Sequence, residues 1–376
     1  MKRYYSPCFV RLPASFLPTI SPAAVSVHVT RDTRAHPDYR TLPRPVRKLI
    51  IEDEHYPAED NPPIVYLPDW VDSLTLMYAP AFGPELLFPS CLQDLSLESC
   101  ELTELVGLPP SLQRLWLEGC EELVTIRALP PIMNMVSITD CLALKDYSFL
   151  PRERVERLSI STQAEDLVLN FLPREVGALV FSNCRTISFP PVVSSVTGYL
   201  RLVDSLPLCG LAGLPLSVRD LRLQGLDLEN EQIPGFLRHM TLTECELNLT
   251  QLPAKLESLT LKRVGVRLAQ LPAKLESLTL KRVGVSRLVG LPESLVSLQL
   301  IDLGGLVSYE GMPLGLTHIK VSEITDPEDF PRLPFLESAE LDYVMTKDGT
   351  EYTSGEQYIV DSKCRAKRPP TVSEDR

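Results

Sequence analysis

The chain is poor in aromatic residues and histidine, and it has no long apolar run. Aromatic residues make up 7% of the 376 residues, so a core drawn from the 44% hydrophobic residues must be mainly aliphatic. No stretch approaches the roughly 18 consecutive apolar residues of a membrane helix, and we expect no membrane partner. The net charge of −12 also lacks the basic excess that nucleic-acid binding requires, so we expect no nucleic-acid partner.

Residue patterns that would support catalysis or metal binding are absent from the sequence. The chain has 5 histidines, none in a nucleophile, zinc or acid–base motif, and no glycine-rich phosphate loop. Its 9 cysteines form no CxxC pair, which argues against a zinc site or a closed disulfide framework. We therefore expect a binding protein without catalytic residues, cofactor or metal, and reduced cysteines indicate the cytoplasm.

Proline is abundant, with 34 residues, and its spacing marks a repeat. Fifteen sites at which an apolar residue is followed by proline are almost evenly spaced, mostly every 19 to 22 residues, with one interval of 17 and two of 25. These prolines are Pro43, Pro68, Pro89, Pro109, Pro130, Pro151, Pro173, Pro190, Pro215, Pro234, Pro253, Pro272, Pro292, Pro313 and Pro334. A period of this length predicts a solenoid in which each unit contacts only its neighbours.

An L-x-x-L-x-L pattern follows the prolines, as in Leu112, Leu115 and Leu117 after Pro109. The unit after Pro190 is irregular, and its strand is expected at Tyr199 to Val203, after extra residues. A cysteine stands three residues beyond the last apolar position in several units: Cys100, Cys120, Cys141, Cys184 and Cys245. Residues 251–266 recur unchanged at 270–285, so one 19-residue block has been duplicated in tandem. A folded chain accommodates such a duplication easily if the block equals one structural turn.

The proline and leucine pattern has a simple physical explanation. Alternating leucines predict a short strand with one buried face. Proline cannot donate to a strand ladder, so it must lie outside the strand. About 20 residues leave no room for a long return helix, so we expect extended or 3₁₀ segments there and parallel stacking of the strands. Because cysteine behaves as a small buried hydrophobe, the five cysteines are expected to form a buried column rather than a metal site.

The unit L-P-x-x-L-x-x-L-x-L-x-x-C-x-L resembles the leucine-rich-repeat family. Its length and L-P start are similar to the shortest subclass, known from secreted bacterial effectors. The resemblance covers residues 42–342 and implies an α/β-type solenoid, a horseshoe with one parallel concave sheet and a mostly non-helical convex side. This chain has cysteine where those effectors mostly have asparagine. Some effectors carry a ubiquitin-ligase domain, but only Cys364 follows the repeats here, so that activity is not inferred.

The two ends depart from the repeat. Residues 1–41 are expected to be an N-terminal cap or degenerate first repeat, with Leu17, Val27 and Val29 at apolar positions. Because residues 1–31 contain no acidic residue, a mitochondrial transit peptide or a secretion signal is an alternative. Residues 343–376 are polar and aperiodic and predict a disordered tail, whose basic residues near Lys363 are either solvated or a nuclear signal.

Function is expected on the concave face, where the x residues of the strands alternate with the leucines. Trp116 stands out as one of two tryptophans, and acidic Glu98 and Glu118 give way to basic Lys262 and Lys281 along the chain. Trp116 is either a binding hot spot or a cover for neighbouring side chains. The predicted binding residues are Asp94, Glu98, Arg114, Trp116, Glu118, Arg157, Arg201, Arg222, His239, Lys262 and Lys281.

These observations lead to three functional hypotheses. The leading one is a cytoplasmic, monomeric protein-interaction module that binds a protein partner on the concave face. The second is a secreted or injected effector that uses the same surface on a host protein. The third is a structural repeat protein without a dedicated ligand.

Overall fold

The computed structural model describes residues 9–14, 17, 20–31, 38–53, 67–78, 87–163, 166–190, 195–246, 252–265, 271–284, 288, 290–303, 312–324, 338–345, 351–352 and 358–359. The chain forms two compact units. Unit 1 comprises Met1–Gly198 and Ser205–Leu208, and unit 2 comprises Tyr199–Asp204 and Cys209–Arg376. Each unit is a stack of coils that contribute strands to a parallel sheet.

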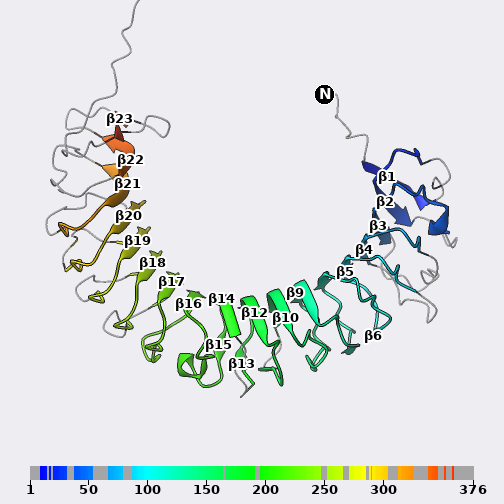
Figure 1. The fold of residues 1–376 in the computed structure, drawn as a ribbon, viewed down its shortest axis with the longest axis horizontal. Coiled ribbons are helices and arrows are strands. Elements are labelled where there is room, and N and C mark those ends of the chain that lie inside the picture. The colour runs from blue at the N-terminus through cyan, green and yellow to red at the C-terminus, as the bar shows by residue number, and fades with distance from the viewer. Residues whose placement is uncertain are drawn as a thin grey trace, which may run out of the picture. The chain divides into compact units, whose positions relative to one another are not determined.

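In unit 1 the sheet strands pair in parallel in the order of the chain (Figure 1). They are β1 (Phe9–Pro13), β2 (Ser26–Arg31), β3 (Lys48–Asp53), β4 (Ser73–Met77), β5 (Asp94–Glu98), β7 (Arg114–Glu118), β9 (Ile132–Thr139), β10 (Arg154–Ser161) and β12 (Glu175–Ser182). The first two precede the first proline-marked repeat, and Val27 and Val29 of β2 are buried.

Unit 2 continues the same pattern from the second part of β14 (Ser195–Val203), whose residues from Tyr199 on pair with β16. The next strands are β16 (Asp220–Gln224), β17 (His239–Thr243), β18 (Ser258–Lys262), β19 (Ser277–Lys281), β20 (Ser297–Ile301), β21 (His318–Ile324) and β22 (Ser338–Met345). The short strands β23 (Glu351–Tyr352) and β24 (Tyr358–Ile359) pair antiparallel with β22, so part of the segment predicted as a disordered tail joins this sheet.

The return segments are extended, and the described residues contain no α-helix. Two short strands, β6 (Glu104–Leu105) and β8 (Thr125–Ile126), form one small parallel sheet. Three more, β11 (Asp166–Val168), β13 (Thr186–Ser188) and β15 (Leu206–Pro207), form another. Two 3₁₀ turns are η2 (Tyr39–Thr41) and η3 (Leu211–Gly213). The predicted solenoid with a mostly non-helical return path is confirmed.

In most of the described repeats, the proline opens a tight turn ahead of the strand. The carbonyl oxygen of Pro109 accepts a hydrogen bond from the backbone N–H of Leu112 at 3.1 Å, and the Pro253 carbonyl accepts one from Leu256 at the same distance. The first residue of β18, Ser258, comes five positions after Pro253. The proline therefore lies outside the ladder, where its missing N–H costs no strand hydrogen bond.

Within the strands, alternate side chains enter the core. In β5 the relative exposure of Leu95 and Leu97 is 1% and 0%, while Asp94, Ser96 and Glu98 remain partly exposed. Within each unit the strands line the inner side of the curve that the coils follow (Figure 1). We call the surface formed by the x residues the concave face.

One backbone position after the strand recurs in a left-handed conformation. Nine described non-glycine residues have positive φ, and all nine directly follow a sheet strand: Tyr78, Ser99, Asp140, Asn183, Asp204, Glu244, Arg263, Arg282 and Asp302. The N–H of Arg263, for example, donates to the carbonyl oxygen of Lys281 at 2.9 Å. This conformation costs a non-glycine residue about 1–2 kcal/mol, but it keeps the coil bonded to its neighbour as the chain leaves the strand.

Gly177 of β12 lies where two coils approach closely, and it gives a test of coil packing. A Cβ atom added there would overlap the backbone carbonyl oxygen of Glu156. We expect Gly177→Ala to destabilise the chain by about 1–3 kcal/mol through overpacking. The measurement is the midpoint of urea unfolding, followed by far-UV circular dichroism. Gly235→Ala is the control, because an added Cβ there meets nothing within 4 Å. Equal midpoints for the two variants would contradict this account.

Candidate functional site

Five predicted binding residues come together on neighbouring strands of unit 1. β5 and β7 pair so that Asp94 faces Arg114 and Glu98 faces Glu118, with Trp116 between them on β7. We call these five residues the Trp116 patch. Sequence reasoning placed them on one face, and the parallel register makes them neighbours.

The polar groups of the Trp116 patch are held by mutual contacts. Arg114 forms an ion pair with Asp94, with a hydrogen bond of 2.6 Å from Nη2 to Oδ2, and this hydrogen bond raises the pKa of Arg114. The indole Nε1 of Trp116 donates to Glu118 at 3.1 Å. The indole N–H is therefore satisfied within the chain, while the apolar ring remains 41% exposed.

The ring borders a shallow hollow of about 180 Å³ on the concave face. Strands β4, β5, β7 and β9 line it, and besides Asp94, Arg114 and Trp116 its side chains are small or apolar, including Thr75, Ser96 and Met135. Met135 was not predicted as a site residue, because a methionine at a concave position of the repeat does not by itself indicate a binding site. The hollow can receive an apolar group next to fixed charges.

Arg157 of β10 stands apart from the Trp116 patch. It is exposed, and its register partners are Met135 of β9 and Ala178 of β12, so a full coil separates it from Arg114. It forms no ion pair with any residue that the structure describes. Arg157 is therefore an isolated cation of unit 1.

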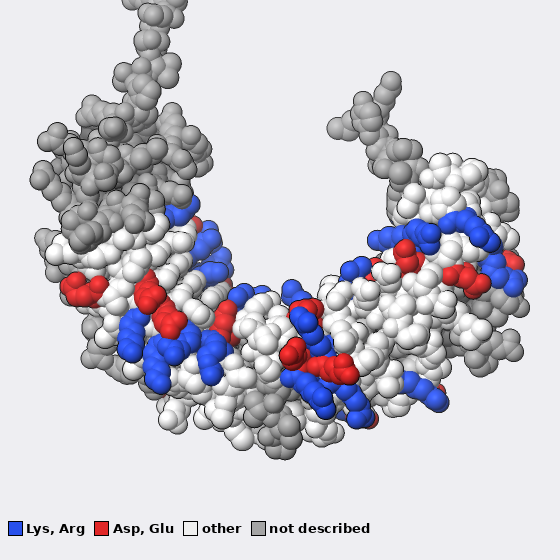
Figure 2. All heavy atoms as spheres, in the orientation of Figure 1, with Lys and Arg blue, Asp and Glu red and all other residues white. Residues whose placement is uncertain are grey.

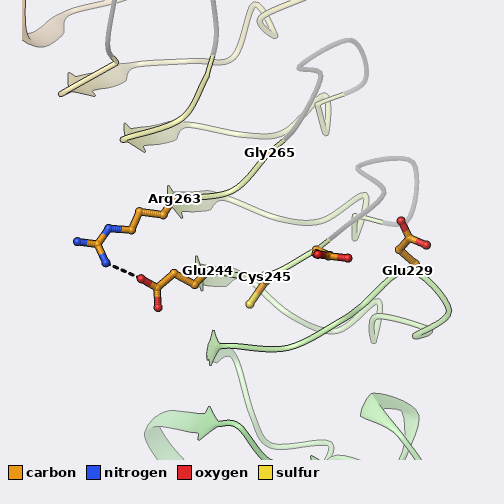
Figure 3. A pocket seen from close by; sticks show the side chains of 6 residues that line it. Glu229, Glu244, Cys245, Arg263 and Gly265 are labelled. Carbon is orange, nitrogen blue, oxygen red and sulfur yellow. Dashed lines mark hydrogen bonds and ion pairs between the residues drawn. The ribbon is translucent and has the colours of Figure 1, made fainter.

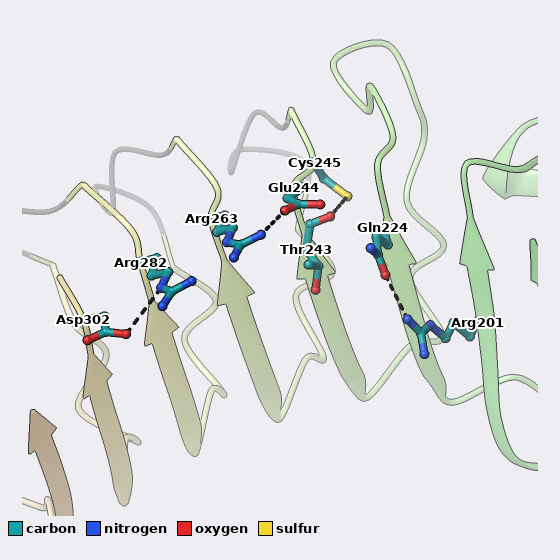
Figure 4. A network of polar contacts seen from close by, with 8 residues as sticks. All are labelled: Arg201, Gln224, Thr243, Glu244, Cys245, Arg263, Arg282 and Asp302. Atoms are coloured by element: carbon teal, nitrogen blue, oxygen red, sulfur yellow. Dashed lines mark hydrogen bonds and ion pairs between the residues drawn. The ribbon is translucent and has the colours of Figure 1, made fainter. Parts of the chain in front are cut away.

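In unit 2, Arg201 and Arg222 occupy neighbouring positions on β14 and β16. The guanidinium of Arg222 lies 3.8 Å from the ring centroid of Tyr199 and pairs with Asp220 at 2.9 Å, and the hydrogen bond to Asp220 raises the pKa of Arg222. Arg201 donates to Gln224 at 2.8 Å (Figure 4). Tyr199 and Asp220 thus belong to the arginine pair, although the sequence did not mark them.

The predicted His239 is exposed on β17, in register with Asp220. Lys262 and Lys281 face each other across β18 and β19. Sequence reasoning missed their neighbours Arg263 and Arg282, because the strand pattern ends at the lysines. The repeated Lys-Arg pair in the duplicated block was the available signal. Figure 2 shows lysine and arginine side chains on the coils of unit 2, interspersed with carboxylates.

The predicted cysteine column is buried in both units, since Cys100, Cys120, Cys141, Cys184 and Cys245 are all free and buried. Their thiols donate to backbone carbonyls, as Cys245 does to Thr243 at 3.3 Å. Burial raises the pKa of the Cys184 and Cys245 thiols. These two thiols are therefore protonated and act as packing groups. Valine takes the same column position at Val264 and Val283.

A second hollow, of about 500 Å³, lies beside the strand ends of unit 2 (Figure 3). Its lining includes Glu229, Glu244, Glu246 and Arg263. Figure 3 shows Glu244 joined to Arg263 at one edge, with Glu229 apart from them. Within the described ranges, no group of three or more His, Cys, Asp or Glu residues is arranged to hold a metal ion.

No helix in the described part of the chain is both long and apolar enough to cross a membrane.

The repeat length, the L-x-x-L-x-L strands and their parallel stacking decide the fold. It is a short-repeat leucine-rich-repeat solenoid. No family model matches the sequence. No curated protein matches it either.

Two solved structures resemble this leucine-rich-repeat chain. One is a circular LRR protein, CroV588, with a TM-score of 0.48 and 15% identity over 91% of this chain and 60% of that one. The other is YopM from Yersinia enterocolitica, with a TM-score of 0.42 and 19% identity over 88% of this chain and 72% of that one. The chain thus spans less than two thirds of the circular protein.

The buried thiols predict a pH dependence of stability. An ordinary thiol titrates near about 8.5, so above that pH the unfolded chain loses protons that the folded Cys184 and Cys245 retain. Stability should therefore fall as the pH rises above about 8.5, by up to about 1.4 kcal/mol per pH unit for each thiol.

The measurement is the urea midpoint at pH 7.5 and 9.5 for the wild type and for Cys184→Val/Cys245→Val. Valine already fills this column at Val264 and Val283, so the variant should fold. We expect a smaller pH-dependent loss in the variant, since its two side chains cannot ionise. Identical losses in the two proteins would show that these thiols do not contribute.

Proposed function

We propose that this chain is a protein-interaction module that binds a protein partner through its concave face. The observation that carries the proposal is the Trp116 patch, in which an exposed indole lies between fixed charged side chains. Tryptophan and arginine are enriched among residues that dominate binding energy. Their preorganisation reduces the conformational entropy lost when a partner binds.

The shape of the patch favours a protein over a small molecule. Its hollow of about 180 Å³ is smaller than the roughly 300–1,000 Å³ typical of small-molecule sites. The polar residues Thr75 and Ser96 line the same hollow as the ring. An apolar anchor surrounded by polar groups is the usual arrangement of a protein interface.

The charge on the last strand position differs between the units and supports a specific partner. In unit 1 this position carries Glu98 and Glu118, and in unit 2 it carries Lys262 and Lys281. A partner with complementary charges would be steered and aligned by each group.

We also propose that the protein is a cytoplasmic monomer. A secreted or injected effector that uses the same surface is the alternative, and detection of the protein in culture supernatant would favour it.

Replacing the indole tests the proposal directly. We expect Trp116→Ala to weaken partner binding by about 2 kcal/mol or more, about 30-fold, as for other hot-spot residues. Partners are captured from lysate with wild-type bait and identified by mass spectrometry, and their affinities are then measured by calorimetry. Leu87→Ala is the control, because Leu87 is also in unit 1 and 81% exposed but outside the Trp116 patch.

A second variant tests whether unit 2 contacts the same partner. Arg222→Glu reverses a charge that lies over Tyr199 and should weaken binding if the partner reaches that face. Both variants should keep the wild-type free energy of unfolding within about 1 kcal/mol, since both side chains lie on the concave face and neither is part of the buried core. Full binding by both Trp116→Ala and Arg222→Glu would rule out the concave site. Capture of no specific partner by the wild-type bait would favour the hypothesis of a structural repeat protein without a dedicated ligand.

A further inference from the structure

Four cations meet at the carboxyl-terminal ends of β18 and β19, in a chain whose net charge is −12. Lys262, Arg263, Lys281 and Arg282, together with Thr243 of β17, line a hollow of about 200 Å³. We call these five residues the basic strand-end site. All five belong to unit 2 and lie on three successive coils.

The fold fixes this arrangement through the backbone. Lys262 and Lys281 are register partners on adjacent strands. Arg263 and Arg282 both have left-handed backbones, with φ of 52° and 54°, and their N–H groups donate at 2.9 Å to Lys281 and Ile301 respectively. Since two coils repeat the same conformation, each Lys-Arg pair stands about 4.8 Å, one strand spacing, from the other.

Each arginine forms an ion pair with an acidic residue on a flanking coil, but neither ion pair uses all of the N–H donors of its guanidinium group. Arg263 pairs with Glu244 through Nη1, and Arg282 pairs with Asp302 through Nε at 3.3 Å (Figure 4). A guanidinium has five N–H donors, so both retain donors for a ligand. Lys262 and Lys281 form no ion pair with the described residues. The four cations and two carboxylates leave a formal charge of +2.

We propose that the basic strand-end site binds a phosphorylated side chain of a protein partner. A phosphate ester carries a charge of about −1.5 to −2 at neutral pH, which complements this local charge. Its oxygens accept several charge-assisted hydrogen bonds at once, and guanidinium groups suit it because they can bind in a bidentate manner. The hydroxyl of Thr243 supplies a further donor at the rim.

The neighbouring positions favour one compact dianion over a long polyanion. On either side of Lys262 and Lys281, the last strand position is taken by the uncharged Thr243 and Ile301. Glu244 and Asp302 then flank the site and repel additional negative charge. A nucleic acid would need a longer basic stripe to release many counterions. The inference rests on the proposed function, because it names the kind of group that Lys262 and Lys281 of the concave face would bind on a protein partner. It concerns a different unit from the Trp116 patch, so it can be tested separately.

The test measures binding of fluorescein-labelled nonapeptide pools by fluorescence anisotropy, using the full chain. One pool has phosphoserine or phosphothreonine at its centre, a second has the unphosphorylated residue, and a third has two adjacent glutamates. We expect the phosphorylated pool to bind at least about tenfold more tightly than either other pool, as one to three new charge-assisted hydrogen bonds would give.

The duplicated block offers a matched control. Lys262→Glu/Lys281→Glu should abolish the preference for phosphate, and the neutral Lys262→Gln/Lys281→Gln should reduce it. Lys255→Glu/Lys274→Glu makes the same charge change in the same two repeats, but at exposed positions in the proline turns before the strands. It should bind the phosphorylated pool within about twofold of wild type, as expected for distant surface charges. Urea midpoints establish that each variant is folded.

Three results would overturn the proposal. Equal losses in the strand-end and proline-turn variants would indicate diffuse electrostatics instead of a site. Equal binding of the diglutamate pool would show that carboxylates suffice. Absence of binding by the phosphorylated pool would exclude a phosphate site. None of these results bears on the partner captured through Trp116, so the two proposals can fail separately.

Discussion

The whole structure depends on burial of alternate leucines between coils that are too short to form a core alone. Leu259 and Leu261 of β18 are fully buried only because β17 and β19 present leucine or methionine in the same register. Each coil therefore stabilises its neighbours, and the backbone ladder holds that register. The proline turn supports this arrangement by leading the chain into the strand without taking a place in the ladder.

The same constraint separates folding from function. Buried positions are fixed by packing, but the alternating exposed positions vary without affecting the core. Trp116 and Arg114 therefore lie beside Leu115 and Leu117 without disturbing them. The left-handed residue that follows many of the described sheet strands adds another variable position at the sheet edge. It is tyrosine, serine, asparagine, an acidic residue or arginine in different coils. The binding properties of this chain therefore depend on which side chains occupy the exposed positions of a regular solenoid.

Most of the fold could be predicted from the sequence, because proline spacing and leucine alternation are strictly periodic signals. All fifteen prolines precede sheet strands, and the cysteine column is buried as expected. The irregular strand was also anticipated from Tyr199 to Val203, although it begins at Ser195. The site was less predictable, since contacts such as Arg222 over Tyr199 depend on which side chains the register brings together. The positive φ of Arg263 and Arg282 could not be predicted from the sequence, because arginine rarely adopts a positive φ.

The tandem duplication shows how such a surface can acquire a new property without a new fold. Copying 19 residues reproduced the buried leucines and Val264 as Val283, so packing was preserved. The same event placed a second Lys-Arg pair one strand away from the first. A single Lys-Arg pair between the same two carboxylates, Glu244 and Asp302, would have no formal net charge. Two adjacent pairs exceed the two flanking carboxylates, and the local charge becomes positive in an acidic protein. Repetition alone therefore converts an ordinary coil edge into a site with a preference for anions.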